Sequence, residues 1–318
     1  MAMDSRRPRL NGQDGPPVRI IEVGPRDGLQ NEAQIVPLEA KVSFVDALSQ
    51  TGVAEIEAGS FVSLRAVPQL ADTDDLFRKI TRRPDVVYSA LVANERGLER
   101  ARAEAVQKIA VFTAASDSFT QRNIHCTVRE SIQRFKPITA GAKRDRLTVR
   151  GYISTAMYCP FEGRIAPSSV VRVMRDLLDL GVDEISLGDT IGRGAPRDVR
   201  TLLDHALTEL AGAPLSLHFH DTYGLAVANV LTAWMEYGIT SFDTSAGGLG
   251  GCPYAPGASG NAATEDTVHA LKASGAAVAV DERRVVAAAK QLEPFLTHPL
   301  SSRLSSLYRQ SETYEAVR

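Results

Sequence analysis

Cysteine is scarce in this chain, and long apolar runs are missing. The 318 residues hold only three cysteines, an odd number at wide spacing, which excludes a disulfide framework and is typical of reduced thiols in the cytoplasm. No apolar run approaches the roughly 20 residues that span a bilayer, so we expect no membrane partner. Residues 1–17 are polar, lack the apolar core of a secretory signal and predict a disordered tail.

An excess of charge of one sign is missing as well. Lysine and arginine number 36 against 38 acidic residues, which gives a formal net charge of −2. This balance argues against a nucleic-acid partner, because such proteins carry a marked basic excess. Hydrophobic residues make up 44% of the chain, enough for a globular protein with a sizeable core.

What the chain does contain is a regular alternation of strand-like and helix-like segments. Eight short β-rich runs are separated by stretches with helical periodicity, and no linker-like composition interrupts residues 18–275. The pattern predicts an α/β protein, a (β/α)8 TIM barrel, with a doubly wound sheet of eight strands as the alternative. We expect one domain over residues 18–318, including additional C-terminal helices from residue 281. The expected strands are Val18–Val23, Glu55–Ala58, Val86–Val92, Lys108–Thr113, Thr148–Ser154, Glu184–Leu187, Leu215–Phe219 and Ser241–Thr244.

The segment after Pro167 illustrates the helical signal. Val170, Val173, Met174 and Leu177 follow the spacing of an apolar stripe on one helix face. Pro167 suits a first helical turn, where its missing N–H costs nothing, and Gly181 suits the end of the helix.

Polar residues gather after the expected strands, where a barrel of this kind places its chemistry. His218 and His220 are two apart on a strand, so their side chains share one face. Asp27 follows the first strand, and Asn261 can add an amide oxygen. Two imidazoles with oxygen ligands suit Mg²⁺ or Mn²⁺, although Zn²⁺ stays open, as does a hydrogen-bonded structural pair of histidines.

Arg26, beside Asp27, admits two interpretations. It forms an ordinary ion pair at the barrel rim, or it stabilises negative charge that develops on a substrate carbonyl. Glu57 and Asp189 are carboxylates that suit partners of Arg26 or general bases. Asp221 either orients an imidazole or caps the following helix.

The run Gly247–Asn261 holds six glycines, two prolines and one cysteine, Cys252. Such a segment cannot build a core. It is either a flexible connection with an incidental thiol or a lid that carries Cys252 to a site. Its position after the eighth strand and beside the expected metal ligands favours the lid.

Five runs together resemble the hydroxymethylglutaryl-CoA lyase family, over nearly the whole of residues 18–275. The first and fourth are shared with the wider group of metal-dependent barrel lyases and Claisen-type synthases, whereas the cysteine run is specific to the lyases. The runs are EVGPRDGLQNE (22–32), AASDSFTQRNIHCTVRE (114–130), SLGDTIG (186–192), HFHDTYGLAVAN (218–229) and GGLGGCPYAPGASGNAATED (247–266).

The resemblance implies a role for each matching residue. A divalent cation, Mg²⁺ or Mn²⁺, is held by Asp27, His218, His220 and Asn261. The implied catalytic residues are Arg26, Cys252, His218 and Asp27. The implied acidic residues that support the site are Glu57, Asp189 and Glu265. Substrate binding is assigned to Arg26, Gln30 and Asn123.

The implied reaction is metal-dependent cleavage of 3-hydroxy-3-methylglutaryl-CoA to acetyl-CoA and acetoacetate, by a homodimer in the cytoplasm, or in the mitochondrial matrix if the source is eukaryotic. Two alternatives stay open: a condensing synthase, and a lyase for another 3-hydroxy-3-alkylglutaryl-CoA. Met157 and Tyr158 stand where the family generally has a small glycine, and we expect Tyr158 to narrow or re-shape the acyl pocket. Gly59 replaces a common threonine, and Cys126 a serine.

Overall fold

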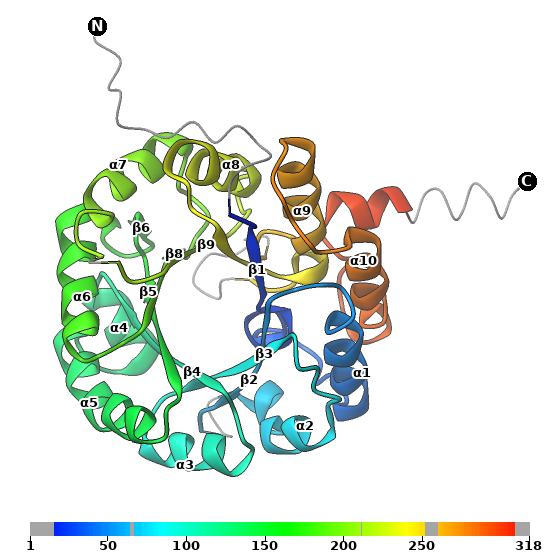
Figure 1. The fold of residues 1–318 in the computed structure, drawn as a ribbon, viewed down its shortest axis with the longest axis horizontal. Coiled ribbons are helices and arrows are strands. Elements are labelled where there is room, and N and C mark those ends of the chain that lie inside the picture. The colour runs from blue at the N-terminus through cyan, green and yellow to red at the C-terminus, as the bar shows by residue number, and fades with distance from the viewer. Residues whose placement is uncertain (1–15, 64–66, 211, 252–259, 309–318) are drawn as a thin grey trace, which may run out of the picture.

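In the computed structural model, eight parallel strands close into a barrel surrounded by helices, as Figure 1 shows. The structure describes residues 16–63, 67–210, 212–251 and 260–308. The strand order around the barrel is β1-β10-β9-β8-β5-β4-β3-β2, so β1 and β10 seal the cylinder. The predicted TIM barrel is therefore confirmed, and the doubly wound sheet is wrong because the sheet has no open edges.

All eight predicted strands exist, most within one or two residues of their predicted bounds. The largest difference is at β2, which runs three residues further than expected because its carboxyl end continues to pair with β3 across a register shift. The strands of the barrel are β1 (Arg19–Glu22), β2 (Glu55–Phe61), β3 (Val87–Val92), β4 (Lys108–Ala114), β5 (Thr148–Ser154), β8 (Glu184–Asp189), β9 (Leu215–Phe219) and β10 (Ser241–Thr244).

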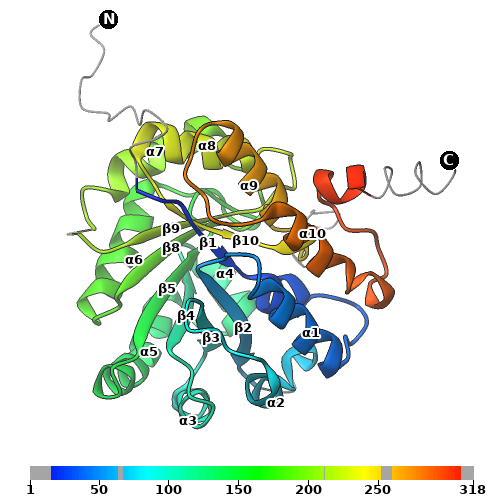
Figure 2. The ribbon, with the colours of Figure 1, turned by 45° about the vertical axis from the view of Figure 1, so that its right-hand side comes forward.

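Helices follow the strands and form the outer ring, which Figures 1 and 2 show from two directions. They are α1 (Leu38–Leu48), α2 (Thr73–Lys79), α3 (Glu95–Ala103), α4 (Asp117–Ile124), α5 (Val128–Arg144), α6 (Pro167–Asp179), α7 (Pro196–Ala206), α8 (Ala226–Tyr237), α9 (Thr264–Ala273) and α10 (Glu282–Lys290). Within the described ranges, no helix has the length and apolar character needed to cross a membrane.

Helix α6 shows how sequence periodicity becomes packing. Pro167 is its first residue, and the predicted stripe of Val170, Val173, Met174 and Leu177 is buried. Burial of such side chains stabilises by about 1.5–3 kcal/mol each, which fixes the helix on the barrel. The helix ends at Asp179, two residues before Gly181.

One feature, a small hairpin, was not predicted from the sequence patterns. Strands β6 (Tyr158–Cys159) and β7 (Gly163–Arg164) form a small antiparallel hairpin inside the β5–α6 connection. The expected C-terminal helices are present as α10, a short 3₁₀ turn (Glu293–Phe295) and a helical segment that starts at residue 303. The predicted tail lies almost wholly outside the described residues, and the single domain over 18–318 stays a prediction.

Candidate active site

The turn after β1 places two charged side chains at the mouth of the barrel. The backbone carbonyl of Val23 accepts N–H groups from Arg26, Asp27 and Gly28, at 3.1, 2.7 and 3.1 Å, in a tight π-helical turn (Gly24–Gly28). A Cβ atom on Gly24 would lie 2.6 Å from a carboxylate oxygen of Glu22, so a larger residue would displace that carboxylate. The turn therefore fixes where Arg26 and Asp27 point.

Arg26 is buried and held by two carboxylates. Its Nε donates to Oε2 of Glu57 at 2.6 Å, and its NH1 group donates to Oδ1 of Asp27 at 2.7 Å. The guanidinium carbon lies 5.4 Å from the centre of the Tyr152 ring. Burial opposes the charge, but Glu57 and Asp27 outweigh it and raise the pKa of Arg26, so the group stays cationic. Both proposed roles of Arg26, ion pair and catalytic cation, are compatible with this geometry.

The two histidines of the HxH run point to one place beside Asp27. The Nε2 atoms of His218 and His220 are 3.1 Å apart, and Nε2 of His218 lies 3.9 Å from Oδ2 of Asp27. One candidate ligand atom from each of these three residues lies within 4.8 Å of the other two. Both histidines are at least nine-tenths buried.

Asn261 closes the group from the segment before α9. Its backbone forms an isolated antiparallel β-bridge with His220. Its side-chain Nδ2 donates to Oδ2 of Asp27 and to the carbonyl of Leu249, both at 3.0 Å. Its Oδ1 is buried and has no hydrogen-bond partner among the described residues. A buried amide oxygen left in this state is costly, and a cation would satisfy it.

The protonation states suit a divalent cation. Burial works against the Asp27 carboxylate, but Arg26 and the histidines outweigh it and lower its pKa to about 2. Burial, together with the charge of His218, lowers the pKa of His220 to about 4, so its ring is neutral at pH 7. Neighbouring ligands on an octahedral ion at about 2.1 Å are about 3 Å apart, which the two imidazole nitrogens satisfy. The donor set therefore fits a divalent cation.

A cavity of about 550 Å³ opens beside this group. Arg26, Asp27, His218 and His220 form one wall, and the predicted substrate residues Gln30 and Asn123 lie on the lining as well. Other parts of the lining are apolar and come from β3, β4, α4 and α5: Leu91, Phe112, Phe119 and Phe135. A polar reacting centre beside an apolar wall is typical of a small-molecule site.

Comparison with known proteins gives the family. The family model described as HMGL-like matches residues 17–292. The chain belongs to the hydroxymethylglutaryl-CoA lyase family. It is 46% identical, over 86% of its length and 91% of the relative's, to the 3-hydroxy-3-isohexenylglutaryl-CoA/hydroxy-methylglutaryl-CoA lyase of Pseudomonas aeruginosa. Family membership makes it an enzyme of the carbon–carbon lyase class.

Solved structures of the family superpose closely. A hydroxymethylglutaryl-CoA lyase from Pseudomonas aeruginosa matches with a TM-score of 0.90 at 43% identity, over 93% of this chain and 99% of that one. An HMG-CoA lyase from Acinetobacter baumannii, solved with coenzyme A and 3-methylmalate, matches with a TM-score of 0.86 at 36% identity, over 91% and 94% of the two chains.

The three acidic residues predicted to support the site lie in different settings. Glu57 contacts Arg26, whereas Asp189 accepts the N–H of Gly194 at 2.8 Å, and burial raises its pKa to about 7. Glu265 is away from the cavity and accepts the N–H of Gly247, so it holds the turn that follows β10. Cys252 lies outside the described residues, and its role in catalysis stays a prediction.

Tyr158 does not narrow the cavity, and that expectation is wrong. Its ring lies under the guanidinium groups of Arg164 and Arg193, at 5.7 and 5.1 Å, because the β6–β7 hairpin turns it away from the cavity lining. At Gly59, a Cβ atom would come within 2.7 Å of Thr73, whose side chain fills the available space.

The structure decides between the two roles predicted for Asp221, and it shows two further residues that no sequence motif indicated. Asp221 accepts the N–H of Ala226 at 2.9 Å, so it caps α8. Tyr152 lines the cavity and donates to Glu57 at 3.3 Å, a role that no motif marked. Glu22 was also missed, although its carboxylate joins the turns after β1 and β10. Their shared signal is a polar side chain at an inward position of a strand.

Proposed function

We propose that this enzyme cleaves 3-hydroxy-3-methylglutaryl-CoA to acetyl-CoA and acetoacetate, with Mg²⁺ or Mn²⁺ as cofactor. The observation that carries the proposal is the meeting of Asp27, His218 and His220 beside the buried cation of Arg26, in one cavity. The names of the relatives support the substrate, and the complex of one of them with coenzyme A supports an acyl-CoA.

Different residues of the chain carry out different parts of the reaction. Asp27, His218, His220 and Asn261 would hold the cation, which lowers the pKa of a bound hydroxyl and orients it when present. Asp27 accepts the proton of the C3 hydroxyl as the bond between C2 and C3 breaks, because His218 has no free lone pair once Nε2 binds the cation and Nδ1 carries the hydrogen. The electron pair moves into the thioester, and Arg26 donates hydrogen bonds to the enolate oxygen that forms. This interaction strengthens as the charge develops, so it accelerates the step.

The remaining residues complete the cycle. Glu57 and Tyr152 keep Arg26 directed into the cavity. Gln30 and Asn123 bind the substrate from the lining. Cys252, which lies outside the described residues, is assigned from the family resemblance to the return of a proton to the acetyl-CoA carbon. A homodimer in the cytoplasm is proposed from the family resemblance alone.

The test is a pair of matched arginine variants. Arg26→Met removes the buried cation, and we expect kcat to fall by about 100-fold or more, as for the loss of one oxyanion donor. Arg175→Met removes an exposed arginine that pairs with Glu209, and its rate should stay at the wild-type value. A near-wild-type rate for Arg26→Met would overturn the mechanism.

The same assay addresses the metal and the synthase alternative. Removing divalent cations by chelation should abolish turnover, and adding Mg²⁺ or Mn²⁺ should restore it. A condensing synthase would release free CoA from an acyl-CoA and a 2-oxo acid, and we expect no such release. Metal-independent cleavage would contradict the assigned cofactor.

A second candidate is a lyase for larger 3-hydroxy-3-alkylglutaryl-CoA thioesters. The apolar lining at Leu91, Phe112 and Phe119 favours it, because the methyl group of the simplest substrate covers little of that surface. A relative that is 46% identical has the isohexenyl substrate in its name. Comparison of kcat/KM across a series of C3 substituents separates the two candidates.

A further inference from the structure

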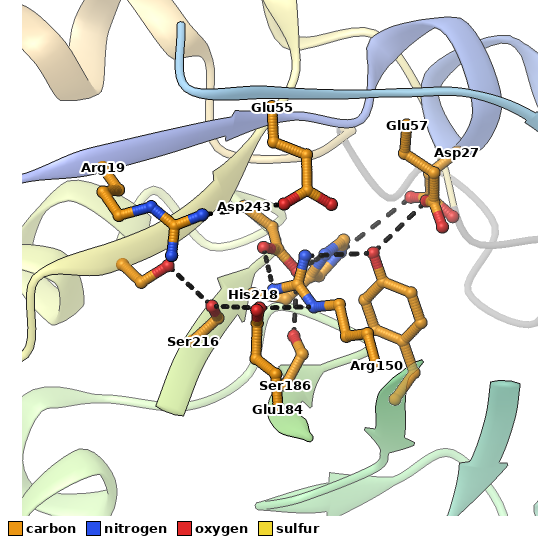
Figure 3. Close-up of polar contacts among 12 residues, drawn as sticks. Arg19, Asp27, Glu55, Glu57, Arg150, Glu184, Ser186, Ser216, His218 and Asp243 are labelled. Carbon is orange, nitrogen blue, oxygen red and sulfur yellow. Dashed lines mark hydrogen bonds and ion pairs between the residues drawn. The ribbon is translucent and has the colours of Figure 1, made fainter. Parts of the chain in front are cut away.

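A chain of buried charges runs through the interior of the barrel and ends at His218. Lys108 donates to Glu55 and to Glu184, both at 2.7 Å, near the amino ends of the strands. Glu184 is also 3.2 Å from Arg150, which continues the chain toward the cavity. Figure 3 shows Arg150 between Glu184 and Asp243, with His218 beside Asp243.

Asp243 is the last carboxylate of this chain, and each of its oxygens is held. Arg150 donates from its NH2 group to Oδ1 at 2.5 Å, and Ser186 donates from its hydroxyl to Oδ2 at 2.8 Å. Asp243 and Arg150 are each about 1% exposed. Its Oδ2 lies 3.4 Å from Nδ1 of His218, longer than a well-formed hydrogen bond.

The contact decides which ring nitrogen of His218 carries the proton. A neutral imidazole that binds a cation through Nε2 must carry its hydrogen on Nδ1. Among the described residues, Asp243 is the one acceptor close to that nitrogen. Neither ring makes a well-formed hydrogen bond at Nδ1 in the described part of the chain, but Nδ1 of His218 has the Asp243 carboxylate at 3.4 Å.

We propose that Asp243 is a positioning residue, which holds the proton of His218 on Nδ1 and leaves Nε2 free to bind the divalent cation. The inference rests on the proposed metal site. Arg150 and Ser186 hold the carboxylate in place, so that it presents one oxygen to the ring. The effect on His218 is direct and on the cation indirect, because Asp243 contacts the His218 ring but is not itself part of the cavity lining.

An ordinary structural network would behave differently. Barrel interiors contain buried ion pairs whose loss lowers stability without altering a ligand site. The positioning role predicts that substitutions at Asp243 weaken cation binding, whereas substitutions lower in the same network leave it unchanged. Ser186 and Ser216 make this comparison possible, since both are buried hydroxyls on neighbouring strands. Ser186 donates to Asp243, but Ser216 contacts Glu184 and Ser241 instead.

The experiment measures Mn²⁺ binding by the full-length, metal-free protein, by calorimetry or by the electron paramagnetic resonance of free Mn²⁺. In Asp243→Asn the amide oxygen remains with Arg150, and the NH₂ group faces His218, which favours the tautomer with hydrogen on Nε2. We expect the Kd to rise about 10- to 100-fold, as for other residues that orient metal ligands. Ser186→Ala should raise it by a smaller factor, and Ser216→Ala should leave it unchanged.

Thermal unfolding of the metal-free variants separates binding from folding. If Asp243→Asn does not fold, the test is the comparison of the Mn²⁺ Kd between Ser186→Ala and Ser216→Ala. The two variants are matched, because each change removes a single hydroxyl. A Kd within twofold of wild type for the folded Asp243→Asn, or for Ser186→Ala in its absence, overturns the inference. Equal weakening by Ser186→Ala and Ser216→Ala overturns it too. Failure of the wild-type protein to bind Mn²⁺ would instead overturn the proposed metal site.

Discussion

Glu22 is a buried carboxyl group whose protonation is tied to its neighbours. Its Oε1 accepts the N–H groups of Gly24 and Ala246, at 2.8 and 3.0 Å. Its Oε2 lies 2.6 Å from the hydroxyl of Thr264, which is 2.8 Å from the hydroxyl of Thr244. Thr264 donates to Oε2, and this bond and the two N–H groups favour the ionised carboxylate. Burial outweighs them and raises the pKa of Glu22 to about 7.

At the residue scale, Glu22 predicts a loss of stability as pH rises. An unfolded glutamate loses its proton near pH 4.5, whereas folded Glu22 keeps it to about pH 7, so unfolding releases a proton in between. The free energy of unfolding should therefore fall between pH 5 and 7.5. Glu22→Gln, which keeps an acceptor and supplies a donor, should flatten this fall, measured as Tm against pH.

The matched control is an exposed glutamate on α3, Glu99. Glu99→Gln should leave the slope of Tm against pH as in the wild type. Asp189, whose pKa burial raises to about 7, contributes a fall of the same sign, so Glu22→Gln removes only part of the slope. An unchanged slope in Glu22→Gln would show that Glu22 ionises in the folded protein as it does in water.

At the scale of elements, Asp266 of α9 caps the start of the helical segment that begins at residue 303. Oδ1 of Asp266 accepts the N–H of Leu304 at 3.0 Å, and Oδ2 accepts the N–H of Arg303 at 2.8 Å. The same segment donates from the N–H groups of Ser301 and Ser302 to the carbonyl of Gly247. The helical segment from residue 303 therefore packs on the turn that follows β10.

Asp266→Ala should lower the free energy of unfolding by about 1 kcal/mol, because two N–H groups at a helix start lose their acceptor. For a domain of this size the expected fall in Tm is about 2 °C. Asp266→Asn keeps one acceptor oxygen and should lose less. Equal Tm values for Asp266→Ala and the wild type would mean that water replaces the cap at no cost.

The elements were predictable where local pattern and tertiary packing agree. The barrel strands are β-rich runs buried on both faces, and the stripe on α6 matches its buried side. The β6–β7 hairpin was missed because two-residue strands leave no periodicity, so the path of Tyr158 could not be read from its neighbours. The metal ligands were found because the carboxyl ends of barrel strands converge.

The buried charges inside the barrel were missed, although their signal was present. Glu55, Lys108, Arg150, Glu184 and Asp243 each lie within a strand that reads as β-rich. Pairs such as Glu55 and Glu57 are two apart and therefore share a face, as His218 and His220 do. The sequence does not show which charges meet across the barrel, because that depends on the register between strands.

At the scale of the whole molecule, Lys108 links charges from β2, β4 and β8. Lys108→Met leaves the buried carboxylates of Glu55 and Glu184 without their shared cation, and we expect a loss of about 3–5 kcal/mol of stability. The control is Lys143→Met, which breaks an exposed pair with Asp183 and should cost no more than about 1 kcal/mol. Denaturant unfolding measures both. Equal losses would mean that the buried cluster is no more costly to break than a surface pair.

Cation binding should stabilise the whole barrel, because its ligands come from opposite ends of the chain. Asp27 follows β1, His218 and His220 belong to the β9 region, and Asn261 precedes α9. The unfolded chain cannot hold these groups together, so Mn²⁺ at 100 times its Kd should add about 2.7 kcal/mol of stability. The expected rise in Tm is roughly 5 °C, and a chelator should reverse it.

His220→Ala should abolish this rise, since it removes one ligand. His298→Ala should preserve it, because His298 is exposed and pairs with Glu32. Differential scanning calorimetry at several Mn²⁺ concentrations measures both variants against the wild type. A rise of equal size in His220→Ala would place the cation at another site. No rise in the wild type would mean that Asp27, His218, His220 and Asn261 meet for a reason other than metal binding.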